Sequence, residues 1–196
     1  MKGLVFALAI LASFTVNAAP VDFSFTGNLA DVSDHQLFDF TVSTTSDVTL
    51  RTLSYGGGTN ADGVAISNGG FDPILTLFDS SGAFVTHNDD GDAHVSADPA
   101  TGATYDAFIK TTLSPGDYTA ALTMYSNFAA GSKLADGFQF TGQVPSDFGN
   151  RTSFWAVDII GVDKATVVPI PAAVWLFGTG LMGLLGMRAK VSMRST

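Results

Sequence analysis

The chain has 196 residues, of which 46% are hydrophobic and 14% charged, with 18 acidic against 9 basic side chains and no cysteine. The net charge of −9 argues against binding to nucleic acid, which requires a basic surface, and the apolar content excludes a disordered acidic tail. Without cysteine, neither a disulfide framework nor a cysteine–zinc site is possible, and the length accommodates one domain plus targeting segments.

The first 18 residues have the pattern of a secretory signal peptide. A basic residue precedes the apolar run 4–12, and small residues end the segment at Ala18. Cleavage after Ala18 is favoured over cleavage after Ala19, because Pro20 would follow the second cut directly. We therefore expect residues 1–18 to direct export through the Sec translocon.

Alternating apolar residues after this segment predict short β-strands separated by Gly, Asp, Ser and Pro turns, with no persuasive helix. The acidic residues are all aspartate, which favours turns and loops over helices. We predict that residues 20–164 form an all-β domain, a jelly-roll-like antiparallel β-sandwich of about nine strands. Residues 163–168 have the composition of a linker.

An acidic hairpin is the most informative part of this domain. The turn Asp79-Ser80-Ser81-Gly82 separates two apolar runs, and pairing of Phe78 with Ala83 would place Asp72 opposite Asp89. The end of the hairpin away from the turn is then rich in oxygen-bearing side chains. Those expected to converge there are Asp72, Asn88, Asp89, Asp90 and Asp92.

The crowding of carboxylates at this end requires a metal ion, a proton or solvent to relieve their repulsion. Ligands that are all oxygen suit Ca²⁺ better than Zn²⁺ or Cu²⁺. The spacing is not that of an EF-hand, because Ala93 and Pro99 stand where that loop needs glycine and glutamate. Two interpretations stay open, a calcium site and a solvated loop whose side chains cap turns. A third, a mixed histidine–aspartate metal site, would use His87 and His94.

The same hairpin carries a family resemblance. The segments Phe71–Asp79, Asn88–Asp90 and Leu113–Tyr118 resemble the bacterial pre-peptidase C-terminal-type β-sandwich. Further segments resemble an uncharacterised subfamily whose members end in a sorting tail, namely 55–60, 98–102, 105–107 and 155–159. The resemblance implies a non-catalytic accessory module of secreted or surface proteins, and it names no ligand.

The chain ends in three distinct parts. Pro169 and Pro171 precede residues 172–187, which contain no charge, and basic residues follow from Arg188 onward. As a helix these residues span about 24 Å, somewhat less than a hydrocarbon core of about 30 Å. The basic tail predicts a cytoplasmic C-terminus, so we expect residues 172–187 to be a transmembrane helix in the inner membrane.

This terminal segment, residues 165–196, resembles the PEP-CTERM sorting signal of Gram-negative bacteria in its Val-Pro-x-Pro-Ala-Ala variant. The resemblance implies that an exosortase, a membrane enzyme similar to a cysteine transpeptidase, recognises Pro169 and Pro171. It further implies a species that makes exopolysaccharide and biofilm matrix. Ile170 replaces the usual glutamate and the basic residues are dispersed, which leaves the exosortase subtype open.

No catalytic constellation stands out in the sequence. There is no Gly-x-Ser-x-Gly elbow, and nothing selects the aspartate pair that a glycosidase without glutamate would need. We therefore expect a non-enzymatic, exported structural or binding protein of the cell surface or matrix, associated with exopolysaccharide. The alternatives are a calcium-dependent carbohydrate-binding module and, ranked last, a secreted hydrolase.

Charge limits the partners of the exported part. Residues 20–168 retain 18 acidic but five basic side chains, a net charge of −13. Such a surface repels anionic polymers unless a cation bridges the two.

Overall fold

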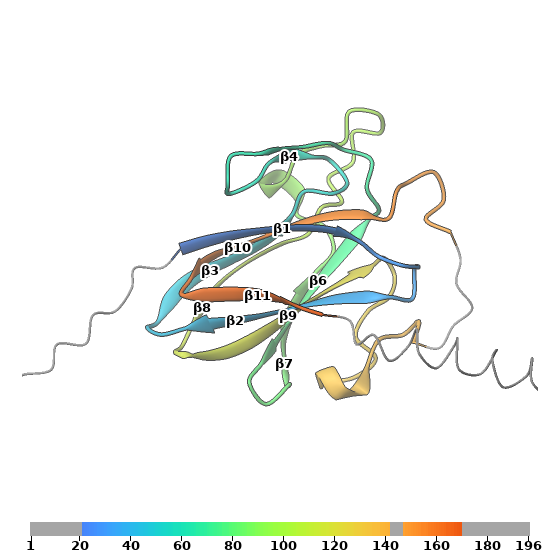
Figure 1. The fold of residues 1–196 in the computed structure, drawn as a ribbon. Helices are drawn as coiled ribbons and strands as arrows, with labels where there is room; N and C mark the ends of the chain where they lie inside the picture. The colour runs from blue at the N-terminus through green and yellow to red at the C-terminus, as the bar shows by residue number, and fades with distance from the viewer. Residues whose placement is uncertain (1–20, 142–146, 170–196) are drawn as a thin grey trace, which may run out of the picture.

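The computed structural model describes residues 21–141 and 147–169, which form two antiparallel sheets packed face to face (Figure 1). The four-stranded sheet has the order β1(Val21–Asn28), β10(Phe154–Val162), β3(Ser46–Thr52) and β8(Phe108–Leu113). The five-stranded sheet has the order β11(Lys164–Val168), β2(His35–Val42), β9(Gly116–Met124), β6(Pro73–Asp79) and β7(Phe84–Asn88). The predicted all-β antiparallel sandwich is confirmed, while its jelly-roll-like character stays a prediction.

Three small elements complete the described part of the chain. A ribbon of β4(Gly58–Thr59) and β5(Ala65–Ile66) lies at one end of the sandwich with the 3₁₀ turn η1(Asp92–His94) (Figure 1). A second 3₁₀ turn, η2(Leu134–Asp136), lies beside the five-stranded sheet.

The core lies between the sheets and follows the two-residue period of the strands. In β2, Phe38, Phe40 and Val42 are buried, whereas Asp39 between them is exposed on the outer face. The core is completed by buried residues of both sheets, including Val48, Leu50, Leu75, Leu77, Leu122, Trp155, Val157 and Ile159. Burial of this many aliphatic and aromatic side chains is the main stabilising contribution to the sandwich.

Strand β6 does not alternate, because both of its faces are covered. Pro73 to Phe78 are all buried. On the outer face, Phe78 and Ala121 pack against Phe138, which is 3% exposed. Phe138 belongs to residues 125–141, which we call the cover segment. The cover segment therefore covers part of the outer face of the five-stranded sheet, over β6 and β9.

Two backbone hydrogen bonds attach the cover segment to the β6–β7 turn. Leu134 N donates to Gly82 O at 2.8 Å, and Phe84 N donates to Ser132 O at 2.9 Å. The turn and the cover segment thus form one wall above the sheet.

The predicted register of the β6–β7 hairpin is wrong. Leu75 pairs with Asn88, where the predicted register gave Thr86, and a bulge separates Leu77 from Phe78. The turn is wider than its sequence indicates, because Phe78 pairs with Phe84 and the Asp79 carboxylate accepts hydrogen bonds from backbone N–H groups inside the turn. Asp72 is therefore not directly opposite Asp89.

The interpretation of residues 163–168 as a linker is also wrong. Residues Lys164–Val168 form the edge strand β11 and pair in full with β2. Ala165 is 7% exposed and belongs to the core, and Gln36 Nε2 donates to Val168 O at 2.9 Å. The β-branched residues that end this stretch favour a strand. The sandwich accordingly continues past residue 164, the boundary taken from the sequence, to Val168.

Several predicted segments lie outside the described residues. They are the signal peptide at 1–18, Pro171 and the membrane helix at 172–187. Within residues 21–141 and 147–169, none of the helices has the length and apolarity needed to cross a membrane.

A substitution at Ala165 tests whether β11 is part of the sandwich. Ala165→Asp places an unpaired carboxylate in the core, so we expect the free energy of unfolding to fall by about 2–4 kcal/mol. Thr166→Asn, at the exposed neighbouring position, is the control and should change it by less than about 0.5 kcal/mol. Urea unfolding of residues 20–169 measures both, and a neutral Ala165→Asp would restore the linker interpretation.

Candidate functional site

The structure brings three of the predicted calcium ligands into one acidic group. Asp72 immediately precedes β6, and Asp89 and Asp90 immediately follow β7. Oδ1 of Asp72 is buried and has no hydrogen-bond partner. Burial, followed by the charges of Asp90 and Asp89, raises the pKa of Asp72 to about 7. In the acidic group, burial and mutual repulsion therefore disfavour the charged form of Asp72.

Electrostatics within the loop point the same way. Partial burial, then Asp89 and Asp92, raise the pKa of Asp90. Arg151 is the cation that acts against these shifts at Asp72, but its guanidinium is bonded to Asp98 at 2.8 Å and lies 3.8 Å above the ring of Tyr55. Arg151, the cation that acts on Asp72 among the described residues, is thus already bound to other partners.

Of the remaining two predicted ligands, Asn88 has a structural role. Asn88 Oδ1 accepts a hydrogen bond from Phe108 N at 2.8 Å, and its Nδ2 donates to Asp90 O at 3.0 Å. Asp92 is exposed and begins η1 with a φ of 49°. The amide of Asn88 therefore ties β7 to β8 rather than facing Asp72.

The mixed histidine–aspartate site is not formed. The His87 ring packs against Phe84 and Phe128, and the His94 ring stacks on Phe108 at 4.6 Å. In the part of the chain that the structure describes, no group of three or more His and Asp side chains lies close enough to hold a metal ion. The carboxylates of the acidic group are close enough to repel but not to coordinate one ion together.

Three buried aspartates were missed by sequence reasoning. Asp98, Asp106 and Asp158 are each 1% exposed or less. Asp158 accepts hydrogen bonds from Ser24, Arg51 and Ala61, and hydrogen bonds from Arg151 and Asn68 lower the pKa of Asp98. All three lie in segments that carry the subfamily resemblance (98–102, 105–107 and 155–159), and Asp158 also interrupts an apolar strand. The resemblance of these segments and the charged residue within an apolar strand are the sequence features that could have indicated the buried aspartates.

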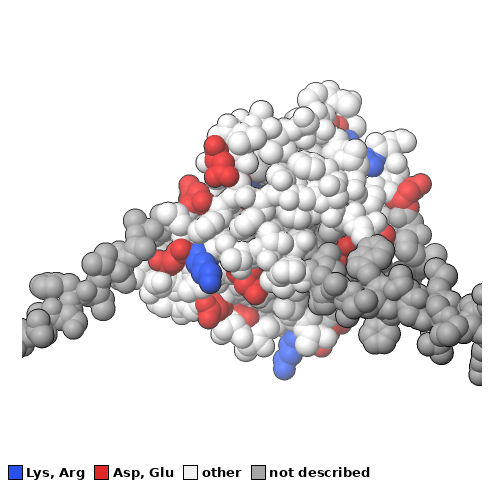
Figure 2. Space-filling model, viewed as in Figure 1, with Lys and Arg blue, Asp and Glu red and all other residues white. Residues whose placement is uncertain are grey.

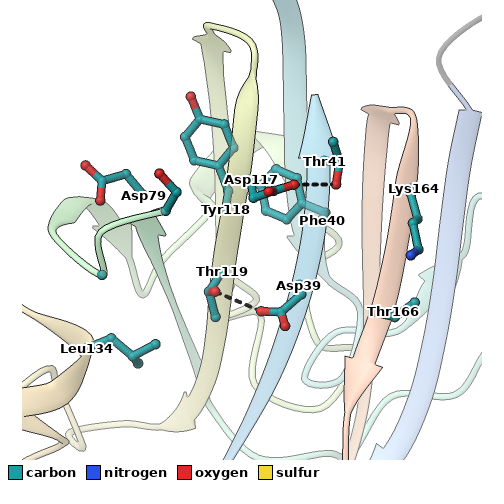
Figure 3. A pocket seen from close by; sticks show the side chains of 12 residues that line it. Asp39, Phe40, Thr41, Asp79, Asp117, Tyr118, Thr119, Leu134, Lys164 and Thr166 are labelled. Carbon is teal, nitrogen blue, oxygen red and sulfur yellow. Dashed lines mark hydrogen bonds between the residues drawn. The ribbon is translucent and has the colours of Figure 1, made fainter. Parts of the chain in front are cut away.

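A separate cleft of about 510 Å³ lies on the outer face of the five-stranded sheet, beside the cover segment (Figure 3). Its floor comes from β11, β2 and β9, and the β6–β7 turn and Leu134 form a wall. Sequence reasoning missed it, because its floor combines strands that are far apart in the chain.

Pro169 follows β11 directly and is exposed, whereas Pro171 lies outside the described residues. Figure 2 shows aspartates scattered over the visible face of the domain with few basic residues between them.

No family model and no curated relative matches the chain. Among solved structures, it is similar to the pre-peptidase C-terminal domain of a collagenase from Bacillus anthracis. The two share 10% identity over 74% of this chain and 90% of that domain, with a TM-score of 0.37. This likeness carries no argument about function, and the β-sandwich rests on the strands themselves.

The raised pKa of Asp72 predicts a pH-dependent stability. A carboxyl whose folded-state pKa exceeds its unfolded value stabilises the fold below the unfolded pKa, and this contribution is lost as the pH rises through about 7. Asp72→Asn keeps the shape and removes the charge. In EDTA, we expect it to exceed the wild type in stability at pH 8 by about 1–2 kcal/mol, after allowance for solvent screening, and to match it near pH 4.

Urea unfolding across this pH range provides the measurement. Asp62→Asn, on the exposed loop between β4 and β5, is the matched control and should track the wild type. A parallel pair of curves for Asp72→Asn and wild type would contradict the prediction.

Proposed function

We propose that the protein is exported and sorted through its C-terminal segment to the cell surface or the extracellular polysaccharide matrix. There the sandwich serves as a structural or binding module rather than an enzyme. The observation that carries this proposal is the course of β11, which leads from the core to the exposed Pro169. Strand β11 thus ends directly before the proline motif of the resembled sorting signal.

The local backbone suits recognition by a processing enzyme. A residue that precedes proline is restricted to extended conformations, and Val168 has that conformation because it pairs with Leu37. Proline lacks a backbone N–H and cannot donate to a sheet. The backbone of the motif would therefore be extended where it leaves the domain, and it would be unable to continue the pairing of β11 with β2. An exosortase that cuts at the motif would leave β11 within the mature sandwich.

In this proposal the N-terminal segment engages the Sec translocon, and residues 172–187 hold the intermediate in the inner membrane of a Gram-negative cell. The acidic exported domain would then associate with exopolysaccharide after processing. Its charge makes direct binding to nucleic acid or to acidic polysaccharide unfavourable.

Removal of the terminal segment tests the sorting. We expect deletion of residues 169–196 to abolish placement in the surface or matrix fraction, because the recognition motif and the membrane segment are both lost. Pro169→Ala/Pro171→Ala keeps the membrane segment, so it should accumulate as an unprocessed membrane form on immunoblots. Pro99→Ala/Pro115→Ala changes two exposed loop prolines and should sort normally. Unchanged fractionation of the deletion would overturn the proposal.

A second candidate function is a calcium-dependent carbohydrate-binding module. The observation that favours it is the buried Oδ1 of Asp72, which lacks a partner beside Asp89 and Asp90. Asp72, Asp89 and Asp90 would hold the ion, which would have to draw the loop after β7 toward Asp72. Asn88 would join only if its amide gave up its present bonds, whereas the exposed Asp92 has no such bonds to break among the described residues. Calcium would replace repulsion with attraction at the acidic group.

Thermal unfolding in EDTA and then in millimolar Ca²⁺ or Mg²⁺ tests this candidate. A site with a dissociation constant one hundredth of the free calcium stabilises the fold by about 2.7 kcal/mol, which raises Tm by several degrees. Asp72→Ala and Asp90→Ala should remove the shift, and Asp62→Ala should keep it. No calcium-selective shift would leave the acidic group as a solvated loop.

A further inference from the structure

The floor of the cleft is a regular grid of polar side chains. Strands β11, β2 and β9 pair in register, so outward-facing residues at matched positions form rows across the sheet. Neighbouring strands are about 4.8 Å apart and successive rows about 6.7 Å. One row contains Thr166, Asp39 and Thr119, and the next contains Lys164, Thr41 and Asp117.

Hydrogen bonds across the strands fix the two carboxylates of this grid. Thr119 Oγ1 donates to Asp39 Oδ1 at 2.8 Å, and Thr41 Oγ1 donates to Asp117 Oδ1 at 2.7 Å (Figure 3). Each bond uses the single hydrogen of a hydroxyl and leaves the second oxygen of the carboxylate open. Among the described residues, neither carboxylate has a Lys or Arg nitrogen within 4.0 Å. The floor therefore offers oriented acceptors and two carboxylates against the single ammonium of Lys164.

The rim of the cleft adds a further negative charge and an apolar side. Asp79 lines it from the β6–β7 turn, and hydrogen bonds from Ser81 and Ala83 lower the pKa of Asp79, which keeps it ionised. Leu134 supplies apolar surface. Lys164 is the basic residue of the lining, so three carboxylates oppose one ammonium. The volume of the cleft lies within the range of small-molecule sites.

We propose that this cleft binds a polysaccharide that carries free amino groups, an amino-sugar polymer with unacetylated amines. Ammonium groups supply the positive charge and the donors that the carboxylates lack, and ring hydroxyls supply further donors to the same open oxygens. An anionic polymer would meet three carboxylates. This inference rests on the proposed association with matrix polysaccharide and names the class of polymer.

The geometry favours a sugar chain over a basic peptide. An extended peptide binds a sheet mainly through backbone hydrogen bonds at an open edge. The cleft instead lies on the face of the sheet, where the side chains of three strands are presented and the backbone groups of β2 and β9 are already paired.

Calorimetric titration of the full chain in a sugar-free nonionic detergent at 150 mM NaCl tests the proposal. The probes are the hexamer of glucosamine, the hexamer of N-acetylglucosamine and an oligomer of mannuronic acid. We expect the glucosamine hexamer to bind at least about tenfold more tightly than its acetylated form. A hydrogen bond to a charged group stabilises a complex more than a neutral hydrogen bond does, and the difference corresponds to about that ratio of dissociation constants. The acidic oligomer should not bind.

Charge variants locate the binding. Asp39→Asn and Asp117→Asn keep an acceptor for the neighbouring threonine, and each should weaken the glucosamine hexamer about tenfold. Asp62→Asn makes the same change of net charge away from the cleft and should have no effect. Lys164→Gln should strengthen binding, whereas Lys110→Gln, on β8 of the other sheet, should not. Unchanged Tm values show that the variants are folded.

Three outcomes would overturn the proposal. They are equal affinity for the free and acetylated hexamers, equal weakening by Asp62→Asn and Asp117→Asn, and displacement of the hexamer by a lysine hexapeptide at lower concentration. Absence of hexamer binding, together with sorting that depends on residues 169–196, would reject the amino-sugar cleft alone. Failed sorting tests with intact hexamer binding would reject the proposed sorting alone.

Discussion

The carboxylate of Asp106 determines the shape of the end of the sandwich where the acidic group lies. It is fully buried and accepts hydrogen bonds from the hydroxyl of Thr52 and from the backbone N–H groups of Ser54, Tyr55 and Gly56, at 2.7–3.1 Å. Those donors would otherwise be buried without partners, at a cost of about 1–3 kcal/mol each. The loop they fix packs closely on the next one, since a Cβ on Gly56 would lie 2.1 Å from Ser96 O. Asp106 also contributes to the raised pKa of Asp72.

Two further buried aspartates of this domain are held by an arginine each. Asp98 and Asp158 each bind an arginine, Arg151 and Arg51, so two of the five basic residues of this part of the chain neutralise buried charge. Removing one partner from such a pair leaves an uncompensated charge in the core, which makes each pair a strong determinant of its loop. Few cations are left to offset the exposed carboxylates. Each pair is neutral as a unit, so the net charge of −13 of residues 20–168 is carried by the remaining side chains.

Sequence reasoning succeeds where one element decides its own structure. The alternation of Phe38, Phe40 and Val42 predicts a strand and its buried face, and repetition of that pattern predicts the sandwich. It fails where a side chain rearranges the backbone, as Asp79 does in the β6–β7 turn. It also cannot place Asp39 beside Thr119, because β2 and β9 are far apart in sequence and meet only in the sheet. The acidic group was found because its members flank one hairpin.

Aspartates of this chain differ in how many of their acceptor positions the protein itself fills, and this difference decides which of them are free to bind a ligand. Asp106 receives four hydrogen bonds from residues 52–56, so both of its oxygens already have a donor. Asp39 and Asp117 each receive one from a threonine, which orients the carboxylate and leaves the other oxygen exposed in the cleft. Asp72 has a buried oxygen with no donor at all. An incomplete, oriented acceptor suits a ligand that brings N–H or O–H groups, whereas a buried oxygen without a donor suits a proton or a metal ion. The two proposed sites thus differ in the ligand chemistry that they suit, although both are built from aspartate.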